Sequence, residues 1–153
     1  SKGVEFELRY RATKKLETWG MFGYNEAKFV RYVKDNQTDY SGNYLPYVPR
    51  FSFNAGANYT IDVQRKLLDR MRLQLQYQGF GKHYWSETNL AWQDYYGLLS
   101  GRISLEKKLC TLSFWTKNLL DADYNSFYFE ALGNSYAQLG KPVLAGASLK
   151  VRF

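Results

Sequence analysis

The sequence lacks any run of about 18 apolar residues, and this absence excludes a transmembrane helix. It has one cysteine, Cys110, which cannot form an internal disulfide. The position of Cys110 among strand residues predicts a buried or lipid-facing thiol rather than a reactive one. Charges interrupt the apolar positions of the first ten residues, SKGVEFELRY, so these residues are not a signal peptide. We therefore expect a mature chain that lacks one, or a piece of a longer chain.

Residues suited to covalent or metal chemistry are also scarce. The sole histidine, His83, lies in a loop beside Tyr84 and Trp85, with no cysteine partner and no acidic cluster at ligand spacing. We expect a solvated loop histidine there, and contact with a haem or a metal is the less favoured alternative. The stretch GFGK, residues 79–82, is too short for a phosphate-binding loop and is interpreted as a strand end. The sequence thus predicts no enzyme, no metal site and no cofactor.

Aromatic residues and positive charge are abundant instead. The 153 residues include fourteen Tyr, ten Phe and four Trp, spread along the whole chain, and the formal net charge is +7. Tyr and Trp suit places where one end of a side chain is dry and the other is wet. Such places include ligand clefts, protein interfaces and membrane interfaces.

Apolar and polar residues alternate again and again, which is typical of β-strands with one apolar and one polar face. The stretch 16–29 fits neither a helix nor a strand period because of Gly20 and Gly23, and we assign it as a strand from its context. The predicted strands are 4–12, 16–29, 51–61, 70–78, 95–106, 110–116 and 144–153. One face is predicted to carry Phe51, Phe53, Leu73, Leu75, Leu149 and Val151, and the other Arg70, Arg72, Lys150 and Arg152.

The links between these strands alternate strictly between short and long. Short links are 14–15, 62–69 and 107–108, and long links are about 34–49, 82–94 and 118–142. An antiparallel meander with short turns on one rim and long loops on the other is the pattern of an outer-membrane barrel. A soluble sandwich is the alternative, although its connections need not segregate by length. The predicted fold is therefore all-β, an antiparallel up-and-down meander of about seven strands.

The number of predicted strands and the pattern of the last strand lead to two further expectations. Bacterial single-chain barrels have an even number of strands, so seven strands predict the C-terminal portion of a transmembrane β-barrel whose missing strands lie upstream. The last strand alternates through Leu149 and Val151 to an aromatic end at Phe153. This end resembles the C-terminal assembly signal of bacterial outer-membrane proteins, which barrel-assembly machinery would read. The alternative is an edge strand whose final Phe fills a core.

Several stretches together resemble one family. They are GVEFELRYRATKKLETWGMFGYNEAKF, GNYLPYVPRFSFNAGANYTI, YQGFGKHYW, LSFWTKNLLDADY and GASLKVRF, in this order along nearly the whole chain. The most specific parts are Gly3-Val4-Glu5, the Pro46–Pro49 stretch, Asn118-Leu119-Leu120-Asp121 with Tyr124, and the final Phe153. In this order the stretches resemble the last third of the barrel of TonB-dependent outer-membrane receptors.

The resemblance implies a barrel of about 22 strands with a plugged lumen, of which residues 1–153 would supply the last seven. The plug domain and the earlier strands are absent from this sequence. The resemblance further implies a receptor in the outer-membrane lipid of a Gram-negative bacterium. Its cargo would be a scarce nutrient, a small molecule or metal chelate such as a ferric siderophore, haem, a cobalamin or an oligosaccharide. A periplasmic TonB-type protein would supply energy through the plug.

Aromatic and basic residues of the long loops and upper lumen are the candidate ligand contacts. They are Tyr40, Tyr44, Tyr47, Arg50, His83, Tyr84, Trp85, Trp92, Tyr95, Tyr128 and Tyr136. Tyr and Trp near strand ends are also typical membrane-interface anchors, and this alternative applies to each of them. On the polar strand faces, Arg9, Arg11, Arg70, Arg72, Arg102 and Arg152 are predicted to line the lumen. There they would pair with acids of the plug or attract an anionic cargo.

Two other functions compete with this interpretation. A basic, aromatic-rich sheet can bind nucleic acid by stacking and phosphate contact. In this chain the Lys and Arg residues alternate with aromatics on opposite faces and no nucleic-acid motif is present, so we expect no nucleic-acid partner. A small outer-membrane barrel with an adhesive or enzymatic role is the other alternative, which binding of cargo by the isolated chain would favour.

Overall fold

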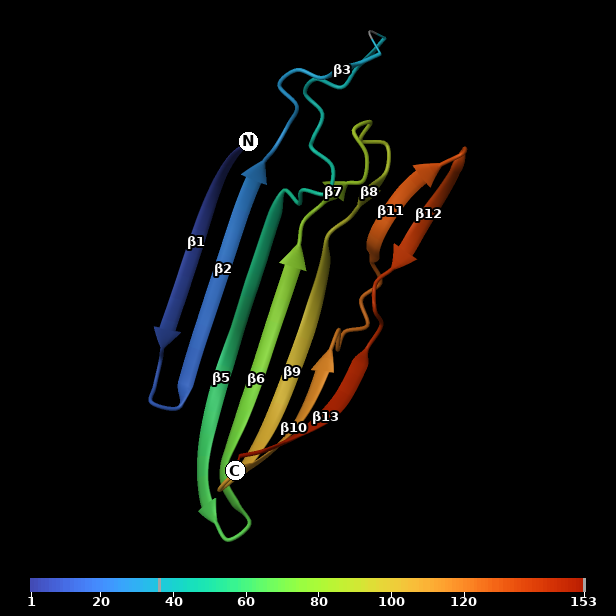
Figure 1. The fold of residues 1–153 in the computed structure, drawn as a ribbon. Helices are drawn as coiled ribbons and strands as arrows, with labels where there is room; N and C mark the ends of the chain where they lie inside the picture. Colours follow the sequence, from blue (N-terminus) through green and yellow to red (C-terminus); the bar gives the residue numbers. More distant parts are fainter. Residues whose placement is uncertain (36, 153) are drawn as a thin grey trace.

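The computed structural model describes residues 1–35 and 37–152, which form one large antiparallel sheet with three small hairpins at one end (Figure 1). The sheet contains seven strands in the order of the chain: β1 (Lys2–Arg11), β2 (Leu16–Glu26), β5 (Phe51–Arg65), β6 (Leu68–Phe80), β9 (Tyr96–Lys107), β10 (Cys110–Lys117) and β13 (Leu144–Val151). The predicted all-β meander of seven strands is confirmed. None of the described residues forms a helix long and apolar enough to span a membrane.

The connections lie at two opposite ends of the sheet. Short turns join β1 to β2, β5 to β6 and β9 to β10 at one end, and the amino terminus lies at the other, with the long loops (Figure 1). Each long loop contains a hairpin that the sequence did not predict: β3 (Val33–Lys34) with β4 (Thr38–Asp39), β7 (His83–Tyr84) with β8 (Trp92–Gln93), and β11 (Asn125–Ala131) with β12 (Asn134–Leu139). We refer to these ends as the turn end and the loop end.

The largest boundary errors concern one link and one strand end. The link 62–69 is much shorter, because β5 continues to Arg65 and β6 begins at Leu68. A register shift between Asp62 and Arg65 lets strand pairing continue beyond the point where the simple alternation stops. The second strand ends at Glu26 rather than at residue 29, since the chain then leaves the sheet to form the first long loop.

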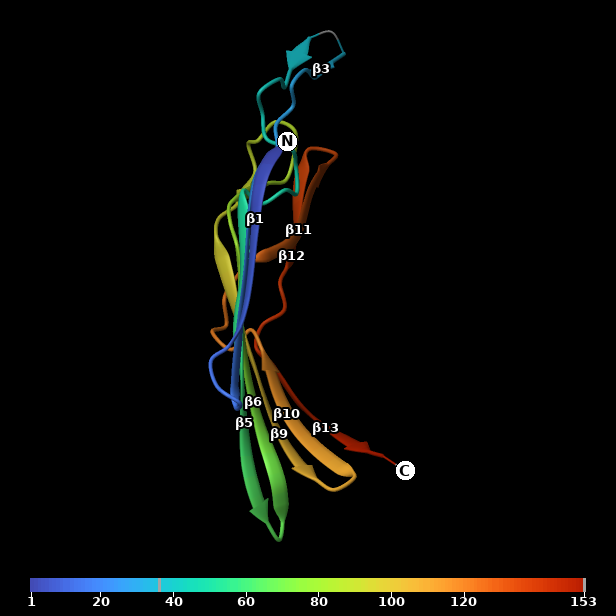
Figure 2. The ribbon, with the colours of Figure 1, turned by 90° about the vertical axis from the view of Figure 1, so that its left-hand side faces the viewer.

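The two faces of the sheet differ as the alternation predicts. Leu73, Leu75 and Ile103 line a shallow apolar groove of about 760 Å³ on one face, which we call the outer face. Arg70, Arg72, Lys150 and Arg152 line a polar pocket on the other, the inner face. In the edge-on view the strands near the carboxy terminus, β10 and β13, bend to one side of the sheet (Figure 2).

The sheet has almost no interior of its own. Among the described residues, the buried apolar side chains are Ala27 and Trp85, while Val4, Phe6 and Leu8 are 67%, 61% and 55% exposed. Apolar side chains are normally removed from water in a stable fold. The outer face therefore needs an apolar medium that this chain does not provide.

Aromatic rings form a band on the outer face near the loop end. Phe22 and Phe51 stack with ring centres 6.5 Å apart, and Phe51 stacks on Tyr95 at 6.1 Å. Phe53 contacts Tyr77 at 5.6 Å, and the Tyr77 and Tyr95 hydroxyls share a hydrogen bond of 2.8 Å. We call these five residues the aromatic girdle, because rings at this height are typical of the membrane interface of β-barrels.

Candidate functional site

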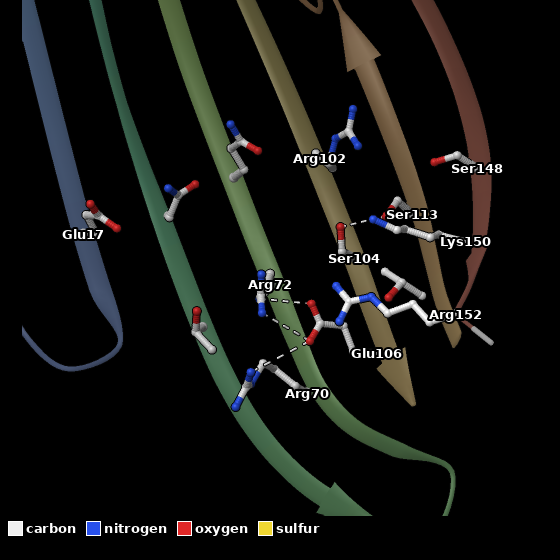
Figure 3. Close-up of a pocket in the computed structure, with 14 residues that line it drawn as sticks. Glu17, Arg70, Arg72, Arg102, Ser104, Glu106, Ser113, Ser148, Lys150 and Arg152 are labelled. Atoms are coloured by element: carbon white, nitrogen blue, oxygen red, sulfur yellow. Dashed lines mark hydrogen bonds and ion pairs between the residues drawn. The ribbon is translucent and has the colours of Figure 1, made fainter. Parts of the chain in front are cut away.

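The inner face carries a polar pocket near the turn end (Figure 3). Its volume is about 570 Å³, and β2, β5, β6, β9, β10 and β13 all contribute to its walls. Five basic and two acidic side chains line it, namely Arg70, Arg72, Arg102, Lys150 and Arg152 with Glu17 and Glu106. Four of the six arginines predicted for the polar strand faces thus line one pocket, whereas Arg9 and Arg11 of β1 do not.

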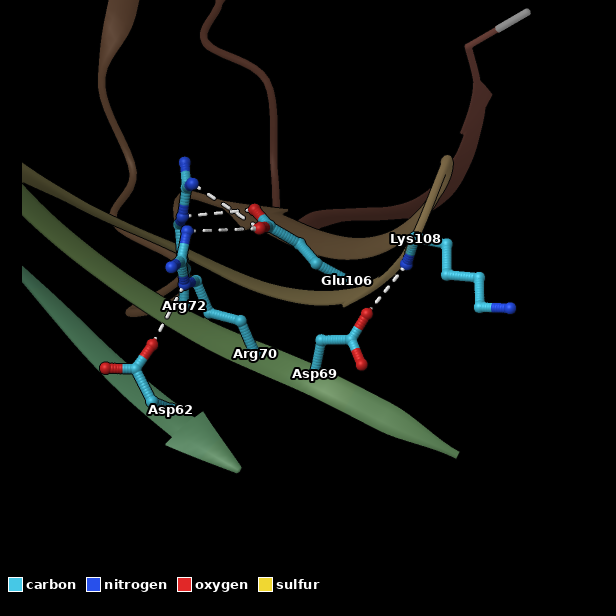
Figure 4. A network of polar contacts seen from close by, with 6 residues as sticks. All are labelled: Asp62, Asp69, Arg70, Arg72, Glu106 and Lys108. Atoms are coloured by element: carbon cyan, nitrogen blue, oxygen red, sulfur yellow. Dashed lines mark hydrogen bonds and ion pairs between the residues drawn. The ribbon is translucent and has the colours of Figure 1, made fainter. Parts of the chain in front are cut away.

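Glu106 neutralises part of this charge. Its carboxylate forms an ion pair with the Arg72 Nε at 3.0 Å and accepts a hydrogen bond from the Arg72 Nη2 at 3.4 Å (Figure 4). The Arg70 Nη1 lies 3.9 Å from the same carboxylate, and the Arg70 Nε donates to Asp62 at 3.1 Å. Arg102 and Lys150 make no ion pair with any other described residue. Positive charge therefore remains available on the inner face for an acidic partner or an anion.

A second cluster lies at the loop end and joins residues far apart in the chain. His83 and Trp85 meet edge to face at 4.6 Å, Tyr47 meets the Trp85 ring at 5.6 Å, and Tyr47 stacks on Phe127 at 6.0 Å. The Tyr47 hydroxyl donates to the Tyr128 carbonyl at 3.2 Å. The β11–β12 hairpin lies on the side toward which β10 and β13 bend (Figure 2). We call these five residues the loop cluster.

His83 is not a solvated loop residue, so that expectation is wrong. It is 6% exposed, because Trp85 and the neighbouring loops cover it. Burial lowers the pKa of His83 below its usual value, an effect that outweighs the Gly81 carbonyl 3.4 Å from its Nδ1. His83 belongs to the short strand β7 outside the main sheet and is therefore a neutral, packed ring.

Trp85 carries an unusual polar atom. It is 6% exposed, and its Nε1 has no hydrogen-bond acceptor among the residues that the structure describes. Buried polar atoms are nearly always hydrogen-bonded, so this donor is an exception within the loop cluster.

The other candidate ligand contacts lie in different places. Tyr95 belongs to the aromatic girdle, Tyr136 stacks on Phe129 in the β11–β12 hairpin at 5.0 Å, and Tyr40 contacts Tyr32 at 5.6 Å. A further group contains Tyr44, Tyr84, Trp92 and Arg50 together with Lys28 and Lys82.

Sequence reasoning omitted Phe127, Lys28 and Lys82 from the candidates. Phe127 and Phe129 alternate in the stretch NSFYFEA, and this period of two was a signal for the hairpin that holds them. The two lysines had no such signal, because their places depend on contacts between loops.

Groups of three or more side chains that could hold a metal ion do not occur among the described residues. The terminal strand β13 places Leu149 and Val151 opposite Leu112 and Cys110 of β10. All four lie on the outer face by the alternation of the two strands. Phe153, the third residue of the predicted assembly signal, lies outside the described residues.

Comparison with known proteins decides the family. The model of the family "TonB dependent receptor-like, beta-barrel" matches residues 1–119. The chain belongs to this family of receptor barrels. TonB-dependent receptors are outer-membrane proteins of Gram-negative bacteria, so the outer face of the sheet is the one that contacts lipid.

Individual relatives agree with the family. The pesticin receptors of Yersinia pestis and of Yersinia enterocolitica are each 25% identical over 99% of this receptor chain. The chain spans 22% of the length of these relatives.

Solved structures share the fold of the sheet. The ferric yersiniabactin uptake receptor of Yersinia pestis superimposes with a TM-score of 0.84 at 22% identity, over 99% of this chain and 23% of that one. The siderophore receptor PiuA of Acinetobacter baumannii has a TM-score of 0.72 at 22% identity, over 96% of this chain and 21% of that one. The receptor chain is thus similar to about a fifth of each barrel-containing protein.

Proposed function

We propose that residues 1–153 form the C-terminal segment of the barrel of a receptor that takes up a ferric siderophore across the outer membrane. The family match over residues 1–119 carries this proposal. The names of two similar structures specify ferric yersiniabactin and siderophores as ligands of those proteins, which supports the same class of ligand here. Upstream residues of the same protein would complete the barrel and fill it with a plug.

The loop cluster is the part of this segment that we propose to contact the siderophore. Tyr47 and Phe127 are 48% and 44% exposed and offer stacked aromatic faces at the loop end. Trp85 is buried and supports the exposed Tyr47 ring, which it meets edge to face at 5.6 Å. Tyr40 and Tyr136, also in the long loops, are further proposed contacts.

The basic pocket is proposed to seat the plug. Arg102 and Lys150 offer positive charge at the turn end, where acidic residues of the plug would pair with them. A periplasmic TonB-type partner acting on this plug would then supply the energy for release of the chelate, and assembly machinery would insert the barrel.

The test uses the full-length receptor in cells that lack other ferric-siderophore receptors. Binding of radioactive ferric siderophore is measured at the cell surface, and uptake is measured with and without an agent that collapses the proton gradient. We expect binding to persist without the gradient and uptake to stop. Uptake that continues without the gradient would contradict an energised partner.

Variants of the full-length receptor test whether the loop cluster contacts the ferric siderophore. Tyr47→Ala and Trp85→Ala are each expected to weaken binding about fivefold, since an aromatic contact contributes about 1 kcal/mol. Tyr59→Ala is the matched control, because Tyr59 lies on the outer face away from the loops. Equal binding by all three variants and the wild type would exclude the loop cluster as the contact surface.

A further inference from the structure

The long loop between β10 and β13 is closed at its base by the side chain of Asn118. Asn118 follows β10 directly and is 4% exposed. Its Nδ2 donates to the Ala122 carbonyl at 3.1 Å and to the Lys141 carbonyl at 3.0 Å, and its Oδ1 accepts from the Ala122 N–H at 2.9 Å. One side-chain amide therefore joins the start of the loop to its end.

Asp121 makes a second link of the same kind. Its carboxylate accepts from the Val143 N–H at 3.1 Å, and its own N–H donates to the Asn118 carbonyl at 2.9 Å. Asn118 and Asp121 both have a φ of 49°, in the left-handed region that Asn, Asp and Gly adopt most readily. Residue type and backbone conformation thus agree at both positions. We call Asn118, Asp121, Ala122, Lys141 and Val143 the loop base.

Tyr124 packs the loop base against the inner face. Its ring stacks on Tyr96 at 4.5 Å with the two planes 6° apart, and Tyr96 stacks on Phe80 at 5.2 Å. Phe80 lies on the inner face because it is an even number of residues from Arg72 along β6. Glycine at position 140 lets the returning chain pass directly against the Tyr124 ring, which a Cβ there would overlap. The loop therefore leaves the sheet in a fixed direction.

The β11–β12 hairpin continues in this direction to the loop cluster. It forms a two-stranded sheet of its own beside the main sheet (Figure 2). The Asn125 N–H donates to the Gln93 Oε1 at 2.9 Å, and Phe127 stacks on Tyr47 at 6.0 Å. The Tyr47 hydroxyl donates to the Tyr128 carbonyl at 3.2 Å. The position of Phe127 relative to Tyr47 thus depends on the direction in which the hairpin leaves the loop base.

We propose that Asn118 is a positioning residue for siderophore binding, which fixes the β11–β12 hairpin so that Phe127 and Tyr47 form one surface. This inference rests on the proposed role of the loop cluster in contacting the siderophore. Every hydrogen bond that the described residues make with the Asn118 amide lies within the loop base. Asn118 therefore acts through the hairpin and not by contact with the chelate.

Removal of the Asn118 amide has a defined consequence for affinity. Without its three hydrogen bonds the two ends of the loop are joined less firmly, and the hairpin can take other directions. We expect the direction seen in the structure to be populated about one tenth of the time. The affinity for the ferric siderophore then falls about tenfold, because the apparent affinity is proportional to the fraction of receptor in the competent state.

The test variant is Asn118→Gly in the full-length receptor. Glycine adopts the left-handed backbone of residue 118 without strain, so the substitution removes the amide and leaves the turn possible. Lys141→Ala is the matched control, because it changes an exposed side chain of the loop base and keeps the carbonyl that Asn118 contacts. If Asn118→Gly does not fold, Asp121→Gly takes its place, since it removes only the second link.

Spin labels measure the direction of the hairpin in the absence of siderophore. They are attached at Leu90→Cys, in the link between β7 and β8, and at Leu132→Cys, between β11 and β12, where both native side chains are exposed. The background has no native cysteine and includes Cys110→Ala. Electron–electron resonance should give a narrow distance distribution for the wild type and for Lys141→Ala, and a broad one for Asn118→Gly.

Binding and uptake are measured on the same variants with the ferric siderophore that the wild type takes up. Asn118→Gly should need about ten times more siderophore for half-maximal binding and uptake, while uptake at saturation stays at the wild-type level per folded receptor. A role in folding alone would lower the amount of receptor and leave the half-maximal concentration unchanged.

Three results would overturn this inference. The first is the same narrow distance distribution in Asn118→Gly and in the wild type. The second is a broad distribution with unchanged affinity for the ferric siderophore. The third is an equal loss of affinity in Lys141→Ala. In all three cases the wild type still binds the siderophore, whereas a wild type without such binding would contradict the proposed function itself.

Discussion

The indole ring of Trp19 on β2 lies over Gly56 of β5, its direct partner in the strand register, and occupies the space that a Cβ on residue 56 would need. Trp115 of β10 lies in the same way over its partner Gly146 of β13. Each indole covers backbone on the inner face, where the sheet offers few apolar neighbours. A glycine opposite each tryptophan is therefore a packing requirement of the sheet.

Replacing Gly56 with Val should displace the Trp19 ring and destabilise the barrel by about 1–3 kcal/mol, the usual effect of overpacking. Gly20→Val is the matched control, because a Cβ at residue 20 meets nothing within 4 Å. The measurement is the free energy of unfolding of the full-length receptor in urea. Equal losses for the two variants would contradict the packing role of Gly56.

The assignment of faces can be tested with neighbouring residues of one strand. Leu75→Arg on the outer face should cost about 2–4 kcal/mol, the measured range for a charge at the bilayer midplane on a barrel surface. Gln76→Arg on the inner face should change the free energy of unfolding by less than about 0.5 kcal/mol. Unfolding of both variants from lipid vesicles measures the difference, and a larger loss for Gln76→Arg would reverse the two faces.

Much of the sheet could be predicted because its strands are half-exposed. Phe51 and Phe53 alternate with Ser52 and Asn54, and a period of two appears in the sequence when the two faces meet different media. The order of the strands in the sheet could be predicted because short turns join successive strands. The same reasoning placed the basic side chains on the inner face.

The loop end could not be predicted in the same way. His83 is buried because Trp85 covers it and residues 47 and 128 pack nearby, and no local pattern shows a contact across so many residues. The contacts of Lys28 with Tyr44 and of Lys82 with Trp92 likewise join residues that are distant in the sequence. Two-residue strands such as β7 are too short to show an alternation of apolar and polar residues.

Burial of His83 predicts a pH-sensitive loop. The folded loop favours the neutral ring, so the pKa of His83 lies below its ordinary value of 6.5. When the loop opens, the imidazole of His83 regains its ordinary affinity for a proton. Below about pH 6.5 the open state therefore binds more protons than the folded loop does. The stability of the folded loop should therefore fall as the pH decreases through that value and stay constant above it.

Hydrogen exchange of residues 82–93 in the full-length receptor, corrected for intrinsic rates, measures this effect. Wild-type protection should drop at mildly acidic pH. His83→Gln, which cannot gain a proton, should show the same protection at neutral and at mildly acidic pH. A pH dependence that persists in this variant would show that another group causes it.

The terminal strand gives the last prediction. An assembly machine can recognise β13 by strand pairing, because Leu149 is 69% exposed at the edge of this sheet and offers its apolar side chain beside free backbone groups. Leu149→Asp should therefore greatly lower the amount of full-length receptor in the outer membrane.

Leu73→Asp on the internal strand β6 places the same charge on the same face and is the control. Leu73 makes contacts with two neighbouring strands, so its loss of apolar burial, about 1.5–3 kcal/mol if complete, is at least as large. A lower abundance of Leu149→Asp than of Leu73→Asp, with no lower free energy of unfolding in the protein that inserts, would separate recognition from stability. Equal abundance of the two variants in the outer membrane would show that Leu149 is an ordinary lipid-facing residue without a role in recognition.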